Sequence, residues 1–260
     1  MMTYNTRYQE LLTQLEQLKL ETMKEYLPNI IESVNNKEMT FIEALSDLTD
    51  KELRFRAERA ARINLKISNF PYEKRINDFD FDYQPSINRN QIDDLMSLRF
   101  VEHKENILFI GSSGVGKTHL ATSIGIEASS KRISTYFINC HVLINKLVKA
   151  YHENRHEAVL KQYFKAQVLI IDEIGYLPID KLGANLFFQL IAMRYEKKPT
   201  IITTNIPLSK WADTFSDATL ASAILDRLVH HSTIIKITGK SYRLKGKLDL
   251  NDRASKQPNQ

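Results

Sequence analysis

A glycine-rich run of eight residues follows a short apolar stretch and precedes a segment compatible with a helix. The run is Gly111, Ser112, Ser113, Gly114, Val115, Gly116, Lys117 and Thr118, and His119 comes next. Glycines let a backbone curl until successive N–H groups point inward, and a lysine adds a positive charge there. A strand, such a loop and a helix start are typical of a nucleotide triphosphate site. We expect these nine residues to bind the nucleotide, with the Thr118 hydroxyl on Mg²⁺.

Two adjacent carboxylates, Asp172 and Glu173, end the second informative apolar run, residues 168–171. In phosphoryl-transfer sites one acid holds the metal, and another can orient or deprotonate the attacking water. Taken singly, the two motifs could be a turn before a helix and a strand that ends in solvent. Their order and separation along the chain favour a P-loop domain. In such a domain Asp172 would hold the metal, and Glu173 would orient or deprotonate the attacking water.

Three further polar residues have two interpretations each. Asn205 ends the apolar run 200–204, where it could hold the attacking water or cap the turn before Pro207. Arg227 could reach a nucleotide or pair at the surface with a neighbour such as Asp226. Arg243 follows the last apolar run and could be a site residue or a surface cation.

From residue 91 onward, apolar runs alternate with helix-compatible stretches. We expect strands at residues 107–110, 135–139, 168–171, 200–204 and 234–237. Alternation of this kind predicts an α/β fold with a parallel sheet.

The first 68 residues instead show helical spacing, and we expect a small all-helical domain there. Residues 3–27 predict one amphipathic helix with Pro28 as its stop. Thr40 and Glu43 have capping-box spacing, so a longer helix should follow and end before Pro71. We predict a linker at 69–90 whose aromatic residues pack onto the next domain, a domain at 91–245, and a flexible tail at 246–260.

Composition limits the class of protein. The chain has 260 residues, 43% of them hydrophobic, which suffices for a globular core and excludes disorder of the whole. Its one cysteine, Cys140, should be a small core residue and cannot form an intramolecular disulfide. No apolar run approaches a membrane span, and the first eight residues lack a signal-peptide hydrophobic region. We expect a cytoplasmic protein without a membrane segment.

Positive charge is concentrated locally. The formal net charge is +5, and residues 51–75, with eight basic and three acidic side chains, carry an excess of the same size. A second basic stretch follows the expected strand at 135–139. Both could contact phosphates of nucleic acid, although a solvated helix face is the plainer explanation for any one cation. The candidates for DNA contact are Arg54, Arg56, Arg59, Arg62, Lys146, Lys149 and Arg155.

Together these motifs resemble the IstB-like ATP-binding proteins, transposition helpers of insertion sequences that group with DnaC-type helicase loaders among the AAA+ ATPases. The resemblance runs from about Leu11 to Lys245. It rests on Phe70-Pro71, Phe79-Asp80-Phe81, Gly116-Lys117-Thr118-His119-Leu120, Asp172-Glu173-Ile174-Gly175-Tyr176, Arg194-Tyr195, Thr204-Asn205-Ile206-Pro207, Trp211, Leu225-Asp226-Arg227-Leu228 and Ser241-Tyr242-Arg243-Leu244-Lys245.

The resemblance implies a three-layer AAA+ domain whose five parallel strands have the order 5-1-4-3-2. It implies that Lys117 and Thr118 are the Walker A pair, Asp172 and Glu173 the Walker B pair, and Asn205 sensor 1. By the same resemblance Arg227 is the arginine finger that reaches a neighbouring subunit's nucleotide, and Arg243 is sensor 2. One departure is the short segment after Arg243, which predicts a reduced C-terminal lid.

The implied protein is an ATPase that uses ATP and Mg²⁺. It would form a homo-oligomer with shared active sites on duplex DNA, without sequence preference, and activate a cognate transposase. Three alternatives stay open: a replicative helicase loader, which would prefer single strands, a passive DNA-binding scaffold that holds nucleotide without turnover, and a small-molecule P-loop kinase.

Overall fold

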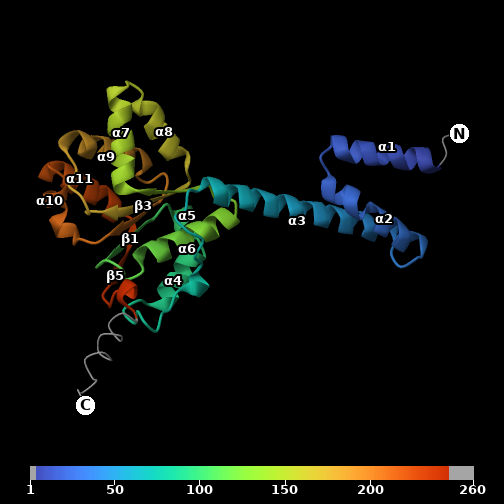
Figure 1. Cartoon of the computed structure of the whole chain (residues 1–260), viewed down its shortest axis with the longest axis horizontal. Coiled ribbons are helices and arrows are strands. Elements are labelled where there is room, and N and C mark those ends of the chain that lie inside the picture. Colours follow the sequence, from blue (N-terminus) through green and yellow to red (C-terminus); the bar gives the residue numbers. More distant parts are fainter. Residues whose placement is uncertain (1–3, 246–260) are drawn as a thin grey trace, which may run out of the picture. The chain divides into compact units, whose positions relative to one another are not determined.

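The computed structural model describes residues 4–245. They form two compact units that meet in the sequence between Ile63 and Asn64, inside one long helix. The helix that contains this boundary is α3 (Phe41–Ile67), drawn in cyan and blue in Figure 1. No helix among residues 4–245 is long and apolar enough to cross a membrane.

The N-terminal unit contains α1 (Tyr4–Gln17), α2 (Glu21–Asn35) and most of α3. Leu15, Leu27, Ile30, Ala44 and Leu48 form its small core. The predicted capping box at the start of α3 is confirmed. The backbone N–H of Thr40 donates to the Glu43 carboxylate at 2.7 Å, and the N–H of Glu43 donates to the Thr40 hydroxyl at 3.3 Å.

The predicted single helix over residues 3–27, stopped by Pro28, was wrong. α1 ends at Gln17 because Lys19 adopts a left-handed backbone (φ 56°), and the N–H of Leu20 then bonds the Leu15 carbonyl at 2.9 Å. Pro28 lies inside α2. Proline removes one helical hydrogen bond, but the burial of Leu27 and Ile30 on the same helix offsets that loss.

The larger unit is built on the predicted five-stranded parallel sheet. Its strands are β1 (Asn106–Gly111), β2 (Thr135–Asn139), β3 (Val168–Ile174), β4 (Thr200–Thr204) and β5 (Ser232–Ile237). They lie in the order β2-β3-β4-β1-β5, all parallel, which is the predicted order read from the other edge. Parallel pairing brings the carboxyl ends of all five strands to one edge of the sheet.

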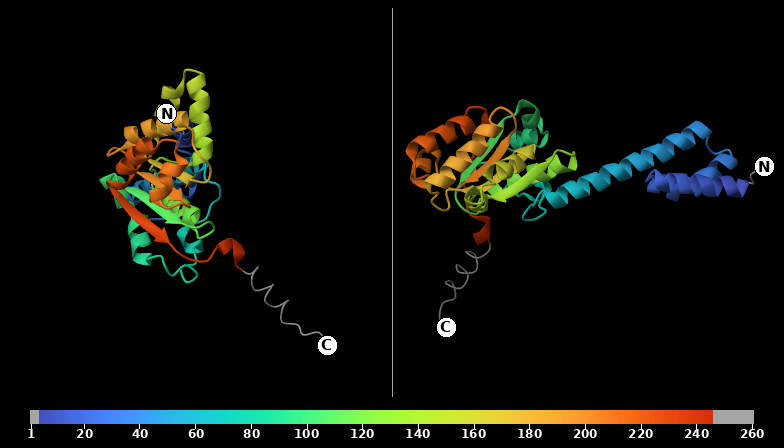
Figure 2. Two further views of the ribbon diagram at one scale, coloured as in Figure 1. Left: turned by 90° about the vertical axis from the view of Figure 1, so that its left-hand side faces the viewer. Right: turned by 90° about the horizontal axis from the view of Figure 1, so that it is seen from above.

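Helices cover both faces of this sheet and make three layers (Figures 1 and 2). Ile107, Phe109, Ile170 and Ile201 belong to the core on one face, and their strand neighbours Leu108, Leu169, Ile171 and Ile202 to the core on the other. The first face is covered by α4 (Arg89–Met96), α5 (Arg99–His103) and α6 (Lys117–Ser130). The second is covered by α7 (Cys140–His152), α8 (His156–Lys165), α9 (Lys181–Arg194), α10 (Trp211–Thr214) and α11 (Ala218–Val229).

Three short 3-10 turns complete the described chain: η1 (Ile76–Asp78), η2 (Leu208–Lys210) and η3 (Tyr242–Leu244). As predicted, the segment before α4 packs an aromatic residue onto the sheet domain, because Phe79 is buried in the first-face core. Between β5 and residue 245 the chain forms only η3. The reduced lid stays a prediction, because it also concerns the segment after residue 245. The predicted tail, residues 246–260, lies outside the described residues.

Cys140 is buried at the start of α7, as predicted. Burial raises the pKa of its thiol to about 12.

Candidate nucleotide site

The glycine-rich run connects β1 to α6. Gly114 and Gly116 have left-handed backbones, with φ of 79° and 100°. A Cβ on Gly114 would lie 2.0 Å from the Ser241 hydroxyl oxygen, and a Cβ on Gly116 would lie 2.6 Å from the Phe79 ring. A side chain at either position would be disfavoured by the left-handed backbone and would clash with its neighbour, so both positions require glycine. Helix α6 begins at Lys117, so its first N–H groups can bind an anion held in the loop.

Lys117 is a buried ammonium group at the base of this loop. Its Nζ donates hydrogen bonds to the carbonyl oxygens of Gly111 at 2.8 Å and Ser112 at 2.7 Å. Burial lowers the pKa of Lys117, and the nearby negative charges of Asp172 and Glu173 act in the opposite direction. The site thus holds a desolvated cation that phosphate oxygens would stabilise.

Asp172 is buried at the end of β3 and accepts hydrogen bonds from two threonines. The Thr118 hydroxyl lies 2.9 Å from Oδ1, and the Thr203 hydroxyl lies 2.6 Å from the same oxygen. Burial raises the pKa of Asp172, while these two hydrogen bonds lower it. A hydroxyl and a carboxylate side by side are the oxygen ligands that Mg²⁺ prefers, so Thr118 and Asp172 fit the predicted metal.

Glu173 follows Asp172 directly, and alternation along a strand would send its side chain to the opposite face. The register of β3 against β4 shifts between Ile171 and Ile174, and Glu173 itself has a left-handed backbone, with φ of 62°. Its N–H donates to the Thr203 hydroxyl at 2.9 Å. A bulge of this kind redirects a side chain, and both acids consequently lie at the same site.

A cavity of about 580 Å³ opens over the loop at the carboxyl edge of the sheet. It brings together nine residues predicted from the sequence: Ser113, Gly114, Gly116, Lys117, Thr118, His119, Glu173, Asn205 and Arg243. Four other predicted residues of the two motifs do not line it. Ser112, Val115 and Asp172 are sequence neighbours of lining residues, and the carbonyl of Gly111 accepts a hydrogen bond from the lining residue Lys117. The volume suits a nucleotide-sized ligand.

Five lining residues were missed by sequence reasoning: Tyr72, Lys74, Asp78, Tyr176 and Tyr242. The first three lie in the segment predicted only as a linker, which carries no phosphate-binding pattern. His119 lies beside this segment, with Nε2 3.0 Å from the Arg75 carbonyl oxygen, and burial lowers its pKa. The available signals were the closeness of Tyr176 to Glu173 and of Tyr242 to Arg243 in the sequence.

Of the three polar residues with two interpretations, two line the cavity and one does not. Asn205 lines the cavity at the end of β4, next to β1 in the sheet. Arg243 also lines it, with Nη1 3.4 Å from the Ser113 hydroxyl. Arg227 does not line the cavity: its Nη1 bonds the Ala223 carbonyl on its own helix at 3.0 Å, and its guanidinium lies 4.6 Å from the centre of the Phe188 ring.

The candidate DNA-contacting residues differ in the partners they already have. Arg54, Arg59 and Arg62 are exposed on α3, and Lys146 and Lys149 are exposed on α7. Arg155 pairs with Glu153.

Arg56 instead supports the N-terminal unit. Its Nε bonds the buried Glu52 carboxylate at 2.7 Å, and its Nη2 bonds the Lys19 carbonyl at 2.9 Å. Glu52 also accepts the backbone N–H of Thr22 at 3.0 Å.

Comparison with known proteins gives a consistent result. The profile of the family described as IstB-like ATP binding protein matches residues 13–249. The chain is 54% identical over 238 residues to an insertion sequence IS232 ATP-binding protein from Bacillus thuringiensis subsp. berliner, covering 92% of this chain and 95% of that one. It is 43% identical over 230 residues to the corresponding IS5376 protein of Geobacillus stearothermophilus, covering 88% and 92%.

Among solved structures, DnaI has a similar fold. The TM-score is 0.54 at 22% identity, and the match covers 64% of this chain and 92% of DnaI.

Proposed function

The chain belongs to the family of IstB-like ATP-binding proteins, and on that premise we propose that it is an ATP-hydrolysing, DNA-binding transposition helper. The observation that supports hydrolysis most directly is the convergence of Lys117, Thr118, Asp172 and Glu173 at one end of the sheet. These residues fit the requirements of phosphoryl transfer from ATP to water.

Each residue has a definite part in the proposed reaction. The loop N–H groups and Lys117 bind the phosphates, and Glu173 orients and deprotonates the attacking water, with Asn205 beside it. Thr118 and Asp172 would hold Mg²⁺, which when bound neutralises charge on the phosphate oxygens. Arg243, on the rim near Ser113, adds a positive charge on the same side of the cavity.

Arg227 lies outside the cavity of its own subunit, which supports a role in trans. We propose that subunits assemble so that Arg227 of one reaches the nucleotide of the next. An arginine supplied across an interface stabilises charge on the transferred phosphoryl group and makes turnover depend on assembly.

Duplex DNA is the proposed second ligand, and the cognate transposase the proposed partner. The relatives of this chain are named as proteins of insertion sequences, which supports transposition as the setting. Arg54, Arg59, Arg62, Lys146 and Lys149 supply exposed positive charge for contacts with phosphates, which do not read base sequence.

The decisive experiment measures ATP turnover and particle size together, as functions of protein concentration, with and without duplex DNA. We expect turnover per subunit to rise with concentration and with duplex, and a nonhydrolysable ATP analogue to enlarge the particle on DNA. ATP retention without turnover would indicate the passive scaffold, and preference for single strands would indicate a helicase loader. Absence of nucleotide binding would overturn the proposal.

A further inference from the structure

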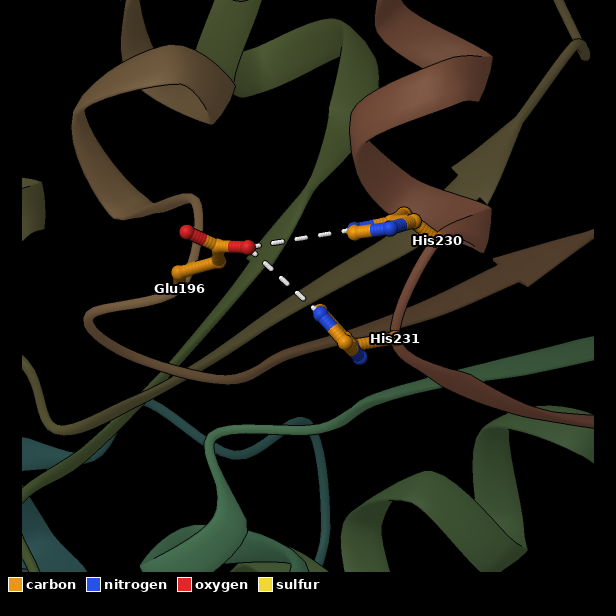
Figure 3. Close-up of side chains that lie close together, drawn as sticks. All are labelled: Glu196, His230 and His231. Atoms are coloured by element: carbon orange, nitrogen blue, oxygen red, sulfur yellow. Dashed lines mark ion pairs between the residues drawn. The ribbon is translucent and has the colours of Figure 1, made fainter.

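A cluster of one carboxylate and two imidazoles lies away from the nucleotide cavity. Glu196 comes from the turn between α9 and β4, and His230 and His231 come from the junction of α11 and β5 (Figure 3). Since this junction precedes β5 and the turn precedes β4, the cluster is at the amino edge of the sheet. The nucleotide cavity is at the opposite, carboxyl edge.

The side chains converge on one carboxylate oxygen. Oε1 of Glu196 is 3.5 Å from Nε2 of His231 and 3.8 Å from Nδ1 of His230. One ligand atom from each of the three residues can be chosen so that all lie within 4.8 Å of one another. All three residues are exposed, so an ion could reach them from solvent.

These distances fit side chains that bind one metal ion together better than side chains joined by direct hydrogen bonds. An N–H···O hydrogen bond spans about 2.7–3.2 Å, shorter than either contact here. Two ligand atoms on a tetrahedral Zn²⁺ ion, each bonded at about 2.0–2.1 Å, lie roughly 3.3 Å apart. The two contacts of Glu196, at 3.5 and 3.8 Å, are close to that value, and the two imidazole nitrogens lie within 4.8 Å of each other. Because the side chains are exposed, they can rotate to close the remaining difference.

The backbone that carries these ligands is held firmly. Next to Glu196, the buried Arg194 guanidinium donates hydrogen bonds to the Thr200 hydroxyl and to four backbone carbonyls. The backbone carbonyl of Arg194 accepts hydrogen bonds from the N–H groups of Lys197 and Lys198, both at 2.9 Å, and these bonds close the turn. On the other side, the His231 carbonyl accepts the N–H of Asn106 at 2.8 Å. Both segments are therefore anchored to the sheet, as a site with fixed ligands requires.

We propose that Glu196, His230 and His231 bind one divalent transition-metal ion of the Zn²⁺ type. Imidazole nitrogen favours such ions over Mg²⁺, which prefers oxygen ligands. The Tyr195 hydroxyl lies 2.7 Å from Nδ1 of His230, so a further oxygen is at hand for the fourth position, which water can otherwise fill.

Such an ion would join the end of α11 to the turn after α9. Arg227 lies on α11 three residues before His230, which directly follows the last residue of this helix, so α11 carries the proposed finger and leads into two of the three metal ligands. The metal site does not depend on the proposed ATPase, and its test needs no nucleotide.

The test is a Co²⁺ titration of the full chain without nucleotide and with Mg²⁺ in excess, followed by visible absorption. Co²⁺ stands in for the spectroscopically silent Zn²⁺, and Mg²⁺ occupies sites made only of oxygen. We expect saturation at one equivalent and displacement by Zn²⁺. Glu196→Gln and His231→Gln should each weaken binding about tenfold or more, since even residues that only support a metal ligand commonly contribute that much. His103→Gln, an exposed histidine on α5, is the matched control and should bind as the parent does.

A second measurement uses heat denaturation, in which Zn²⁺ should raise the Tm of the parent and of His103→Gln but not of the other two variants. Glu196→Gln and His231→Gln change different segments of the chain. If one of these variants fails to fold, the other still tests the metal site. Absence of saturation at one equivalent in the parent would overturn the proposal. If the parent and the folded variants bind Co²⁺ equally well, the three side chains do not ligate the metal, and the cluster is only an ion pair.

Discussion

The side-chain amide of Asn139 donates a 2.9 Å hydrogen bond to Oε2 of Glu173. The carbonyl oxygen of the same amide accepts the N–H of His141 at 3.0 Å and so caps α7. One residue at the end of β2 therefore links the proposed catalytic carboxylate to the helix that carries Lys146 and Lys149. If α7 contacts DNA as proposed, a shift of this helix would move the hydrogen-bond partner of Glu173 through the Asn139 side chain.

Glu173→Gln should bind ATP about as well as the parent and turn it over at least about 100-fold more slowly, because an amide cannot accept the proton of the attacking water. Nucleotide binding by fluorescence and phosphate release measure the two properties separately. Glu102→Gln, an exposed acid on α5, is the control and should leave both unchanged. Equal turnover in Glu173→Gln and the parent would remove Glu173 from catalysis.

Arg227→Ala and Glu173→Gln should each be inactive alone and regain activity when mixed. In a mixed assembly, the intact pocket of an Arg227→Ala subunit can meet the intact arginine of a Glu173→Gln subunit. Random mixing in equal amounts should restore about a quarter of the parental rate, if one in four interfaces is complete. Phosphate release across a series of mixing ratios checks this. A mixture as inactive as its components would place Arg227 outside the neighbouring site.

Asp172→Asn should abolish turnover and yet stabilise the fold at neutral pH. Burial raises the pKa of Asp172, so between its unfolded and folded values the native state binds more protons than the unfolded chain, and stability falls as pH rises through that window. The Asp172→Asn variant has no carboxyl group there to ionise, so its stability does not fall in this way. We expect its Tm to exceed the parental value by about 2–4 °C, the shift that roughly 1 kcal/mol produces in a domain of this size.

Calorimetry without nucleotide, repeated at lower pH, tests the sign of this effect. The Tm advantage of Asp172→Asn should be full above the folded pKa and shrink as acid protonates the parental carboxyl. An advantage that grows in acid would show that the charge of Asp172 is not its cause.

Arg59→Ala and Arg62→Ala should weaken duplex binding without lowering Tm, whereas Arg56→Ala should lower Tm. The first two side chains are exposed, but Arg56 pairs with the buried Glu52, which would be left without its cation. If Arg59 and Arg62 contact phosphates, each loss should reduce the slope of log affinity against log salt by about 0.9. Fluorescence anisotropy at several salt concentrations measures the slope, with Arg7→Ala as a charge-matched control on α1. Unchanged slopes would exclude α3 from the DNA contact.

The sheet could be predicted from the sequence because burial on both faces makes its central strands β1, β3 and β4 short, largely apolar runs, and the runs alternate with helices. The predicted strand over 135–139 and that over 200–204 have the observed bounds. The break between α1 and α2 was missed because it depends on Lys19 in a left-handed conformation, for which lysine carries no signal.

The candidate site was predictable where a local pattern encodes it and not elsewhere. The glycine loop and the two acids are contiguous motifs. Most of the loop and Glu173 line one cavity, and Asp172 contacts the lining residue Thr118. Tyr72, Lys74 and Asp78 reach it only because their segment folds back over α6, with the Lys74 carbonyl bonded to Ser123. The redirection of Glu173 likewise arises from pairing between strands, which no pattern within β3 reveals.

The burial of Cys140 has a practical consequence. With its pKa near 12 and its sulfur enclosed, the chain's one native thiol should react slowly with maleimides at neutral pH. A single cysteine introduced at an exposed position such as Lys161 would then carry a fluorophore selectively, without prior removal of Cys140. Single-molecule imaging could then follow whether subunits join one another and leave again, as the proposed assembly requires, on an otherwise unaltered protein.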